Sequence, residues 1–195
     1  YSYSSSGFPY GTPMVAPLWG DVDTRNGGQI YYKLSGSNLI VTWNGVRFYP
    51  SSSGLVNTFQ AIIGTNADAL TGVGQNVSLR YGDMQWTTGD ASGGSGGFGG
   101  VPATVGINKG NSVNYVQIGR FNQNNSLYDG PGGAYDGVNY LDNQCVSFNV
   151  SNANNIPPSI TGLPANNTLN LSCGQTVNLS MVAIAPEVNQ NVTVT

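Results

Sequence analysis

Two carboxylates one residue apart, Asp21 and Asp23, are the residues in this chain best placed to do chemistry. In an extended segment, side chains at positions i and i+2 point to the same face, so these two would lie side by side and repel each other. Calcium prefers such oxygen clusters, and Asn26 could supply a further oxygen. In the alternative, which we favour, both carboxylates accept backbone N–H groups of the following turn, with Arg25 nearby. The first interpretation predicts a Ca²⁺ site at Asp21, Asp23 and Asn26, and the second predicts no cofactor.

A second group of residues could contact a sugar. Asp83 and Asp90 lie on either side of Trp86, and an aromatic ring offers a ligand a flat apolar face. Tyr128 and Tyr135 are further candidates, because they lie beside or within a glycine-rich loop that contains two more aspartates. For each residue taken singly the plainer interpretation is structural: a tryptophan in the core, tyrosines at the margins of sheets and loops, and aspartates in turns.

The composition argues against catalysis. The chain has no histidine, which removes Ser-His-Asp and Cys-His catalytic groups and imidazole metal ligands. Glu187 is its only glutamate. A glycosidase needs two carboxylates that face each other across the sugar, and the spacing of the loop aspartates does not define such a pair. We therefore expect a protein that is not an enzyme.

Charge is scarce and scattered. Charged residues make up 8% of the 195 residues, and the lysines and arginines form no basic patch, so nucleic acid is not an expected partner. No apolar run approaches the ~20 residues that are needed to cross a bilayer. A surface kept soluble by amides and hydroxyls is typical of secreted proteins. We expect an extracellular or cell-surface location, with other extracellular proteins, glycans or further copies of the chain as partners.

The glycosylation sequons and the cysteines are also consistent with an extracellular location. The pattern Asn-X-Ser/Thr, which can accept an N-linked glycan, begins at Asn76, Asn124, Asn149, Asn166, Asn170, Asn178 and Asn191. The two cysteines, Cys145 and Cys173, match neither a CxxC redox motif nor a metal site. In an oxidising compartment they could form one disulfide. The alternative is two independent buried thiols.

Short strands separated by turns dominate the pattern. Runs of β-branched and aromatic residues at 30–34 and 39–43 flank a hairpin-type turn at 35–38. Further strands are predicted at 46–49, 58–63, 77–81, 113–118 and 146–150. No segment keeps a 3.6-residue apolar period over three turns. The sequence therefore predicts an all-β, mainly antiparallel, β-sandwich-like domain with long glycine-rich loops and a short C-terminal β segment.

Prolines and asparagines at 152–158 mark a linker between two parts of the chain. Before it we expect an N-terminal arm at 1–13, disordered unless it is docked, and a main β domain at 14–151. After it, residues 159–195 alternate like strands but are too few to fold alone. They resemble the beginning of an immunoglobulin-like or cadherin-like repeat; alternatively, they form a tail that donates a strand to a neighbouring copy.

Five motifs recur in a recognisable order: the run at 16–24, Val41-Thr42-Trp43 with Val46, and the runs at 57–60, 81–89 and 106–110. In this order and spacing they resemble the nidogen-type extracellular (NIDO) domain over about residues 14–150. The tryptophans of these motifs, Trp19, Trp43 and Trp86, are expected in the core.

The resemblance implies a non-enzymatic adhesion or structural module of a cell-surface protein, matrix or filament. Two alternatives stay open. One is a carbohydrate-binding module. The other is a self-assembling filament subunit that donates its C-terminal strand to a neighbour.

Overall fold

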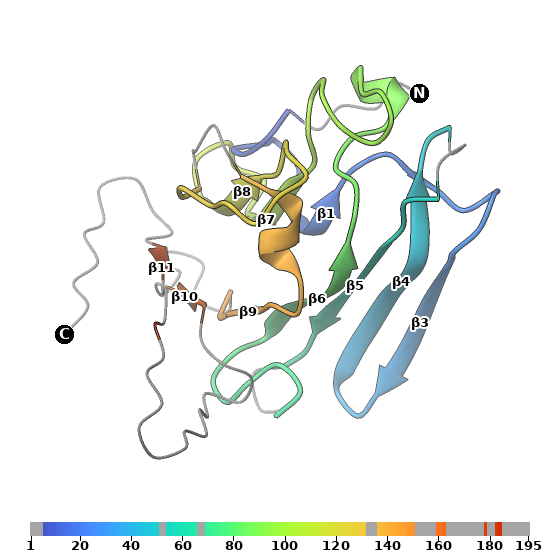
Figure 1. Cartoon of the computed structure of the whole chain (residues 1–195). Coiled ribbons are helices and arrows are strands. Elements are labelled where there is room, and N and C mark those ends of the chain that lie inside the picture. The colour runs from blue at the N-terminus through green and yellow to red at the C-terminus, as the bar shows by residue number, and fades with distance from the viewer. Residues whose placement is uncertain are drawn as a thin grey trace, which may run out of the picture.

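The computed structural model describes residues 6–50, 54–65, 69–131, 136–150, 159–162, 178 and 182–184. This part of the chain is built from antiparallel β-strands (Figure 1) and has no α-helix. Two short 3₁₀ helices, η1 (Asp90–Ser92) and η2 (Val138–Leu141), interrupt the loops. The all-β, sandwich-like prediction is confirmed. Among the described residues, no helix has the length and apolar character needed to span a bilayer.

The larger sheet has six strands in the order β2-β4-β5-β6-β9, with β3 also paired to β4. Its strands are β2 (Val22–Asp23), β3 (Gln29–Ser35), β4 (Asn38–Phe48), β5 (Asn57–Ile63), β6 (Val77–Met84) and β9 (Cys145–Phe148). Alternate residues of the central strands are buried on one face and partly exposed on the other. This alternation is what a sheet with a single covered face requires.

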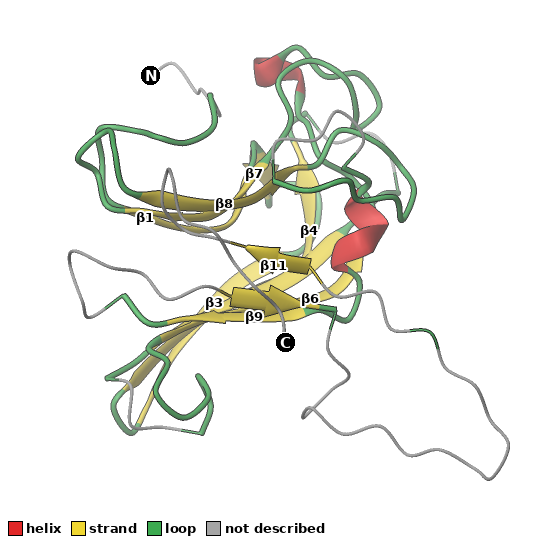
Figure 2. Ribbon diagram, turned by 90° about the vertical axis from the view of Figure 1, so that its left-hand side faces the viewer, coloured by secondary structure: helices red, strands yellow, loops and turns green. Residues whose placement is uncertain are grey.

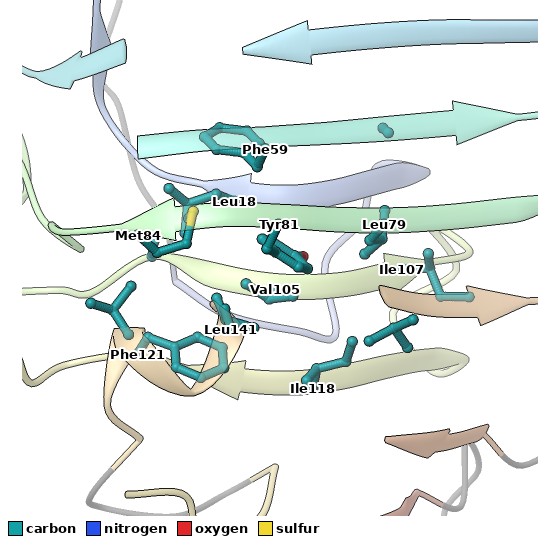
Figure 3. Packing of buried hydrophobic residues seen from close by; sticks show 14 of the residues in the cluster. Leu18, Phe59, Leu79, Tyr81, Met84, Val105, Ile107, Ile118, Phe121 and Leu141 are labelled. Atoms are coloured by element: carbon teal, nitrogen blue, oxygen red, sulfur yellow. The ribbon is translucent and has the colours of Figure 1, made fainter. Parts of the chain in front are cut away.

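A three-stranded sheet covers that face. Its order is β1-β7-β8, with β1 (Met14–Trp19), β7 (Thr104–Asn108) and β8 (Tyr115–Arg120). Figure 2 shows the two layers, and Figure 3 shows the apolar side chains that fill the space between them. The core includes Leu18, Phe59, Leu79, Tyr81, Met84, Trp86, Val105, Ile107, Ile118, Phe121, Leu141 and Phe148.

The predicted hairpin is present, with Ser35 opposite Asn38 and a two-residue turn between them. Gly36 takes φ +57°, a conformation that glycine adopts without steric cost. The predicted strands at 39–43 and 46–49 are one strand, β4. A register shift between Trp43 and Val46, where Gly45 has φ +60°, keeps both halves paired to β5.

The described part of the N-terminal arm, residues 6–13, is docked on the smaller sheet. Phe8 is buried and stacks on Trp19 with ring centroids 6.0 Å apart. The Asn108 side chain accepts a hydrogen bond from the Tyr10 N–H (3.2 Å) and donates to the carbonyls of Tyr10 and Thr12 (both 2.7 Å). The arm therefore covers part of this sheet.

In the C-terminal segment, β10 (Ser159–Thr161) pairs with β11 (Val182–Ile184) and contacts β9. Val182 packs against the core of the main domain. The linker at 152–158 lies outside the described residues, and so does most of the alternating segment at 159–195. The immunoglobulin-like, cadherin-like and strand-donating interpretations of this segment remain predictions.

Candidate functional site

The turn after β2 is organised around Asp23. This carboxylate is buried, with 4% of the residue exposed. Its Oδ1 accepts hydrogen bonds from the Arg25 backbone N–H (3.0 Å) and from Arg25 Nε (2.9 Å), and its Oδ2 lies 2.8 Å from Arg25 Nη2. Asp23 therefore makes the contacts that the favoured interpretation expected, whereas the backbone partner of the Asp21 carboxylate is Ala91 and not the turn.

Arg25 is held in place while most of its side chain faces solvent. Its guanidinium lies over the Tyr49 ring, 4.9 Å from the centroid, and 66% of the Arg25 side chain is exposed. Hydrogen bonding to Asp23 raises the pKa of Arg25 further above its usual value. Tyr49 itself is 40% exposed. A cation and an aromatic ring are thus presented together at the surface.

Tyr49 also joins this turn to the segment that leads into the glycine-rich loop at 92–100. The Tyr49 N–H donates to the Asp21 carbonyl (3.0 Å), and the Tyr49 carbonyl accepts from the Asp90 N–H (2.7 Å). Burial raises the pKa of Asp21, and the negative charges of Asp23 and Asp90 raise it further. We call Asp21, Asp23, Arg25, Tyr49 and Asp90 the loop-end cluster.

The glycine-rich loop beside this cluster is ordered by close backbone contacts. The N–H groups of Thr87 and Thr88 both donate to the Gly97 carbonyl, at 2.8 and 2.9 Å. A Cβ on Gly89 would lie 2.9 Å from the Asp21 Cβ and from the Tyr49 carbonyl oxygen. At Gly100, which has φ +55°, a Cβ would lie 2.3 Å from the Ser92 carbonyl oxygen. The glycines are needed for the loop to lie against the body of the domain.

The proposed calcium ligands do not form an open oxygen cluster. Both Asp23 oxygens are engaged by Arg25, so a cation would have to displace this side chain. Asn26 is exposed. Over the described part of the chain, no group of three or more acidic, histidine or cysteine residues could hold a metal ion. The residues present do not fit a Ca²⁺ site at Asp21, Asp23 and Asn26.

Trp86 cannot stack on a sugar from solvent, because it is completely buried. Its indole Nε1 donates to the Val46 carbonyl (3.0 Å), and its ring packs against Phe48 at a centroid distance of 5.8 Å. The sugar-contact interpretation of Trp86 was therefore wrong, and the core interpretation was right. Trp19 and Trp43 are partly buried.

The aspartates on either side of Trp86 lie in different surroundings. Asp83 is exposed, accepts a hydrogen bond from the Gln85 side chain (2.5 Å) and lies near Asp142, whose pKa is raised mainly by burial. Asp90 belongs to the loop-end cluster. The structure does not bring the two together around the tryptophan as a sugar site would require.

Tyr128 is the middle ring of an aromatic stack. Its ring lies 4.1 Å from that of Tyr140 and 6.3 Å from that of Phe121, and its hydroxyl donates to the Ile118 carbonyl (2.5 Å). Burial raises the pKa of Tyr128 above its usual value. Most of its contacts are thus internal. Tyr135 lies outside the described residues.

A buried carboxylate, Asp136, lies next to this stack. It has no exposed surface, and its Oδ2 accepts a hydrogen bond from the Arg120 N–H (3.1 Å). Gly119 makes room for it, because a Cβ there would lie 2.6 Å from this oxygen. Burial, reinforced by the neighbouring charge of Asp129, raises the pKa of Asp136 from 3.8 to about 7.

This pKa predicts a pH-dependent stability. The folded chain holds the Asp136 proton more tightly than the unfolded chain, so its stability should fall as pH rises from about 4 to about 7 and then level off. Asp136→Asn keeps the shape and carries no charge. We expect it to raise the free energy of unfolding by about 1 to 3 kcal/mol at pH 8 and to change it little at pH 4.

Urea denaturation of both proteins at pH 4 and pH 8 measures this difference. Buried carboxyls common to both, such as Asp21 and Asp142, cancel in the comparison. An equal effect of the substitution at both pH values would contradict the assignment.

The described sequons differ in exposure. Asn124 and Asn178 are exposed, Asn149 is half-buried and donates to the Gly74 carbonyl (2.6 Å), and Asn76 is buried and accepts a hydrogen bond from the Val150 N–H (2.8 Å). The sequons at Asn166, Asn170 and Asn191 lie outside the described residues.

Of the two cysteines in the disulfide prediction, the structure describes one. Cys145 is exposed, and its sulfur lies 3.4 Å from the Ser78 hydroxyl oxygen. Cys173 lies outside the described residues, so the pairing remains a prediction.

Sequence reasoning missed Tyr49 as a candidate. Its only signal was its place as the last residue of the strand predicted at 46–49. Its approach to Arg25 depends on the pairing of β2 with the end of β4, where Val22 lies opposite Phe48 and Asp23 opposite Arg47. No local pattern encodes that pairing.

Comparisons with known proteins agree on one family. The model of the nidogen-like domain matches residues 1–39 and 35–129. Alpha-tectorin of Gallus gallus is 36% identical over 146 residues, which cover 60% of this chain and 7% of that protein. Alpha-tectorin of Homo sapiens is 33% identical over 146 residues, 60% of this chain and 6% of that protein.

A more distant relative is dendrite extension defective protein 1 of Caenorhabditis elegans. It is 26% identical over 155 residues, covering 65% of this chain and 12% of that protein. The chain thus spans only a small part of the length of each of these relatives. No solved structure matches it significantly.

Proposed function

The chain belongs to the nidogen-like domain family, and from this premise we propose that it is a non-enzymatic extracellular module that adheres to other macromolecules in a cell-surface protein, matrix or filament. The sequence supports this role, because it lacks histidine and has a single glutamate. The scarcity of charge and the seven sequons support an extracellular location.

We assign the adhesive contact to the loop-end cluster. One observation supports this assignment. Arg25 and Tyr49 are exposed and stacked on each other, and the buried Asp23 holds Arg25 through an ion pair. Arginine and tyrosine are enriched among the residues that contribute most to protein interfaces. Because the ion pair already fixes the guanidinium, less side-chain entropy is lost when a partner binds.

Carbohydrate binding is the second candidate, and the structure gives it little support. Trp86 is buried, and Asp83 and Asp90 lie apart. Among the described residues, Tyr49 with Arg25 is one exposed aromatic surface that a sugar could contact, and Tyr31 and Tyr32 are others. The Arg25 substitution therefore tests glycan binding at the loop-end cluster as well as binding to proteins there.

Arg25→Ala is expected to weaken adhesion roughly tenfold, as loss of an interface anchor does. The probe is extracellular matrix deposited by cultured cells on a plate, and the readout is saturable binding of the full chain. A glycan array with the same two proteins identifies binding to sugars.

Lys109→Ala is the matched control, since it removes one exposed positive charge outside the loop-end cluster. It should bind like the unchanged chain. The absence of saturable binding to either surface would contradict the proposed function. Equal binding by the two variants would contradict the assignment to the loop-end cluster.

A further inference from the structure

Strand β3 is an edge strand with unusual exposure. Residues 29–34 are all exposed, and they include four large apolar or aromatic side chains, Ile30, Tyr31, Tyr32 and Leu34. Natural edge strands are usually short or carry charges, prolines or bulges that block pairing. Within β3 there is one charge, Lys33, and neither a proline nor an irregularity in its pairing with β4. In Figure 1, β3 lies at the outer edge of the sheet, and none of the described strands or helices lies beyond it.

One face of β3 continues the core-facing surface of the large sheet. Ile30, Tyr32 and Leu34 lie opposite Trp43, Val41 and Leu39 of β4. Directly opposite residues of an antiparallel pair share a face. Trp43 in turn stacks on the core residue Phe59, with centroids 5.0 Å apart. The smaller sheet lies over β5 and β6 and leaves this part of the surface uncovered (Figure 1).

The backbone N–H and C=O groups of the same three residues point away from β4, toward the open edge of the sheet. In a hairpin with a two-residue turn, the residues that flank the turn form a hydrogen-bonded pair. Since Ser35 and Asn38 flank this turn, residues 35, 33 and 31 direct their backbone groups toward β4. Ile30, Tyr32 and Leu34 therefore direct theirs to the open edge. The opposite edge of the sheet, at β9, is contacted by β10 of the same chain.

We infer that β3 binds β3 of a second copy of this chain, antiparallel, with Tyr32 at the twofold axis. Ile30 then lies opposite Leu34 of the second copy, and the two Tyr32 side chains lie opposite each other. In this register, the outward-pointing N–H and C=O groups of one β3 lie opposite those of the other β3 along the whole strand, so they can form hydrogen bonds. The two large sheets become one continuous sheet, and their apolar stripes lie side by side.

The single charge of the strand selects this register. With Tyr32 at the axis, Lys33 faces Tyr31 of the second copy. A shift of the pairing by two residues one way would place Lys33 directly opposite Lys33 of the second copy, which is unfavourable. A shift the other way would place Leu34 opposite Gly28 and lose an apolar pair. A shift by an odd number of residues would place residues whose N–H and C=O groups point outward opposite residues whose groups already point toward their own β4.

This inference goes beyond the proposed function, because it uses no residue of the loop-end cluster. Its first test is sedimentation equilibrium of the full chain over a wide concentration range. We expect a reversible dimer, and Tyr32→Lys should raise its dissociation constant at least about tenfold by placing two like charges opposite each other. Tyr32 is 81% exposed, so the substitution removes no core contact.

The matched control is Val73→Lys, which makes the same change from an exposed apolar residue to lysine, at a site 93% exposed and outside β3. It should dimerise like the unchanged chain. An unchanged chain that stays monomeric at all concentrations would overturn the inference. Equal effects of the two lysine substitutions would also overturn it.

The register has its own test. Tyr32→Glu alone should raise the dissociation constant as Tyr32→Lys does. An equimolar mixture of Tyr32→Lys and Tyr32→Glu should dimerise at concentrations where neither variant does so alone, because only pairing about Tyr32 sets the two opposite charges against each other. If the mixture stays monomeric, this pairing is wrong. Circular dichroism spectra matching that of the unchanged chain would show that each variant is folded.

Discussion

Asn57→Ala is expected to lower the free energy of unfolding by about 3 to 5 kcal/mol, because it removes the partners of three backbone groups, two of them at buried Trp86 and one at partly buried Gln85. The Asn57 side chain is fully buried at the start of β5. Its Nδ2 donates to the Trp86 carbonyl (2.8 Å), and its Oδ1 accepts from the N–H groups of Gln85 (2.6 Å) and Trp86 (3.1 Å). One amide therefore fixes the backbone where the chain leaves β6.

Urea denaturation followed by circular dichroism measures this loss. Asn57→Asp serves as a second variant: its carboxylate still accepts from both N–H groups, but it cannot donate to the Trp86 carbonyl and it places a charge in a fully buried site. At pH 8 it should therefore be at least as destabilising as Asn57→Ala. Gln60→Ala is the control on the same strand: it removes a side-chain hydrogen bond to Thr42 (2.8 Å) at a partly exposed site and should cost about 1 kcal/mol or less. Similar losses for Asn57→Ala and Gln60→Ala would contradict the role given to Asn57.

Trp86→Ala is expected to destabilise the domain by about 3 to 5 kcal/mol, in the range of large-to-small substitutions of buried aromatic residues. The ring fills the space between Phe48 and the glycine-rich loop, where a Cβ on Gly97 would lie 3.0 Å from the Trp86 Cβ. The substitution also leaves the Val46 carbonyl without its indole donor. Both effects act where Trp86 and Val46 are completely buried.

The comparison with Trp43→Ala tests this explanation. Trp43 is only partly buried and packs on one side, against Phe59, so its loss should cost about half as much. Both variants can be measured by the same denaturation experiment. If Trp43→Ala proves the more destabilising, the burial-based ranking of the two tryptophans is wrong.

Those strands of the fold that follow from the local sequence pattern could be predicted. The hairpin of β3 and β4 follows from two β-branched and aromatic runs around Gly36. The strands β5 and β6 follow from short apolar runs between turns. In contrast, β7 (Thr104–Asn108) was not predicted as a strand, because Gly106 interrupts its apolar run. Gly106 is required there, since a Cβ would lie 2.0 Å from the Val116 carbonyl oxygen of β8.

The candidate site could be predicted only in part. The Asp23 turn and its Arg25 partner lie two residues apart, so the sequence alone brings them together. Tyr49 and Asp90 reach the same place through strand pairing and a long loop, and a sequence pattern carries no information about such contacts. Trp86 illustrates the opposite error: the aspartates on either side of it suggested an exposed site, whereas the residue is buried.

The most direct test of the central claim is hydroxyl-radical footprinting of the full chain, free and bound to cell-deposited matrix, with mass spectrometry of the tyrosines. Tyr49 in the loop-end cluster and Tyr10 on the arm are 40% and 37% exposed, so each is a reference for the other. We predict that binding reduces oxidation of Tyr49 several-fold and leaves Tyr10 unchanged. Undiminished oxidation of Tyr49 in the bound chain would contradict the claim that the loop-end cluster makes the adhesive contact.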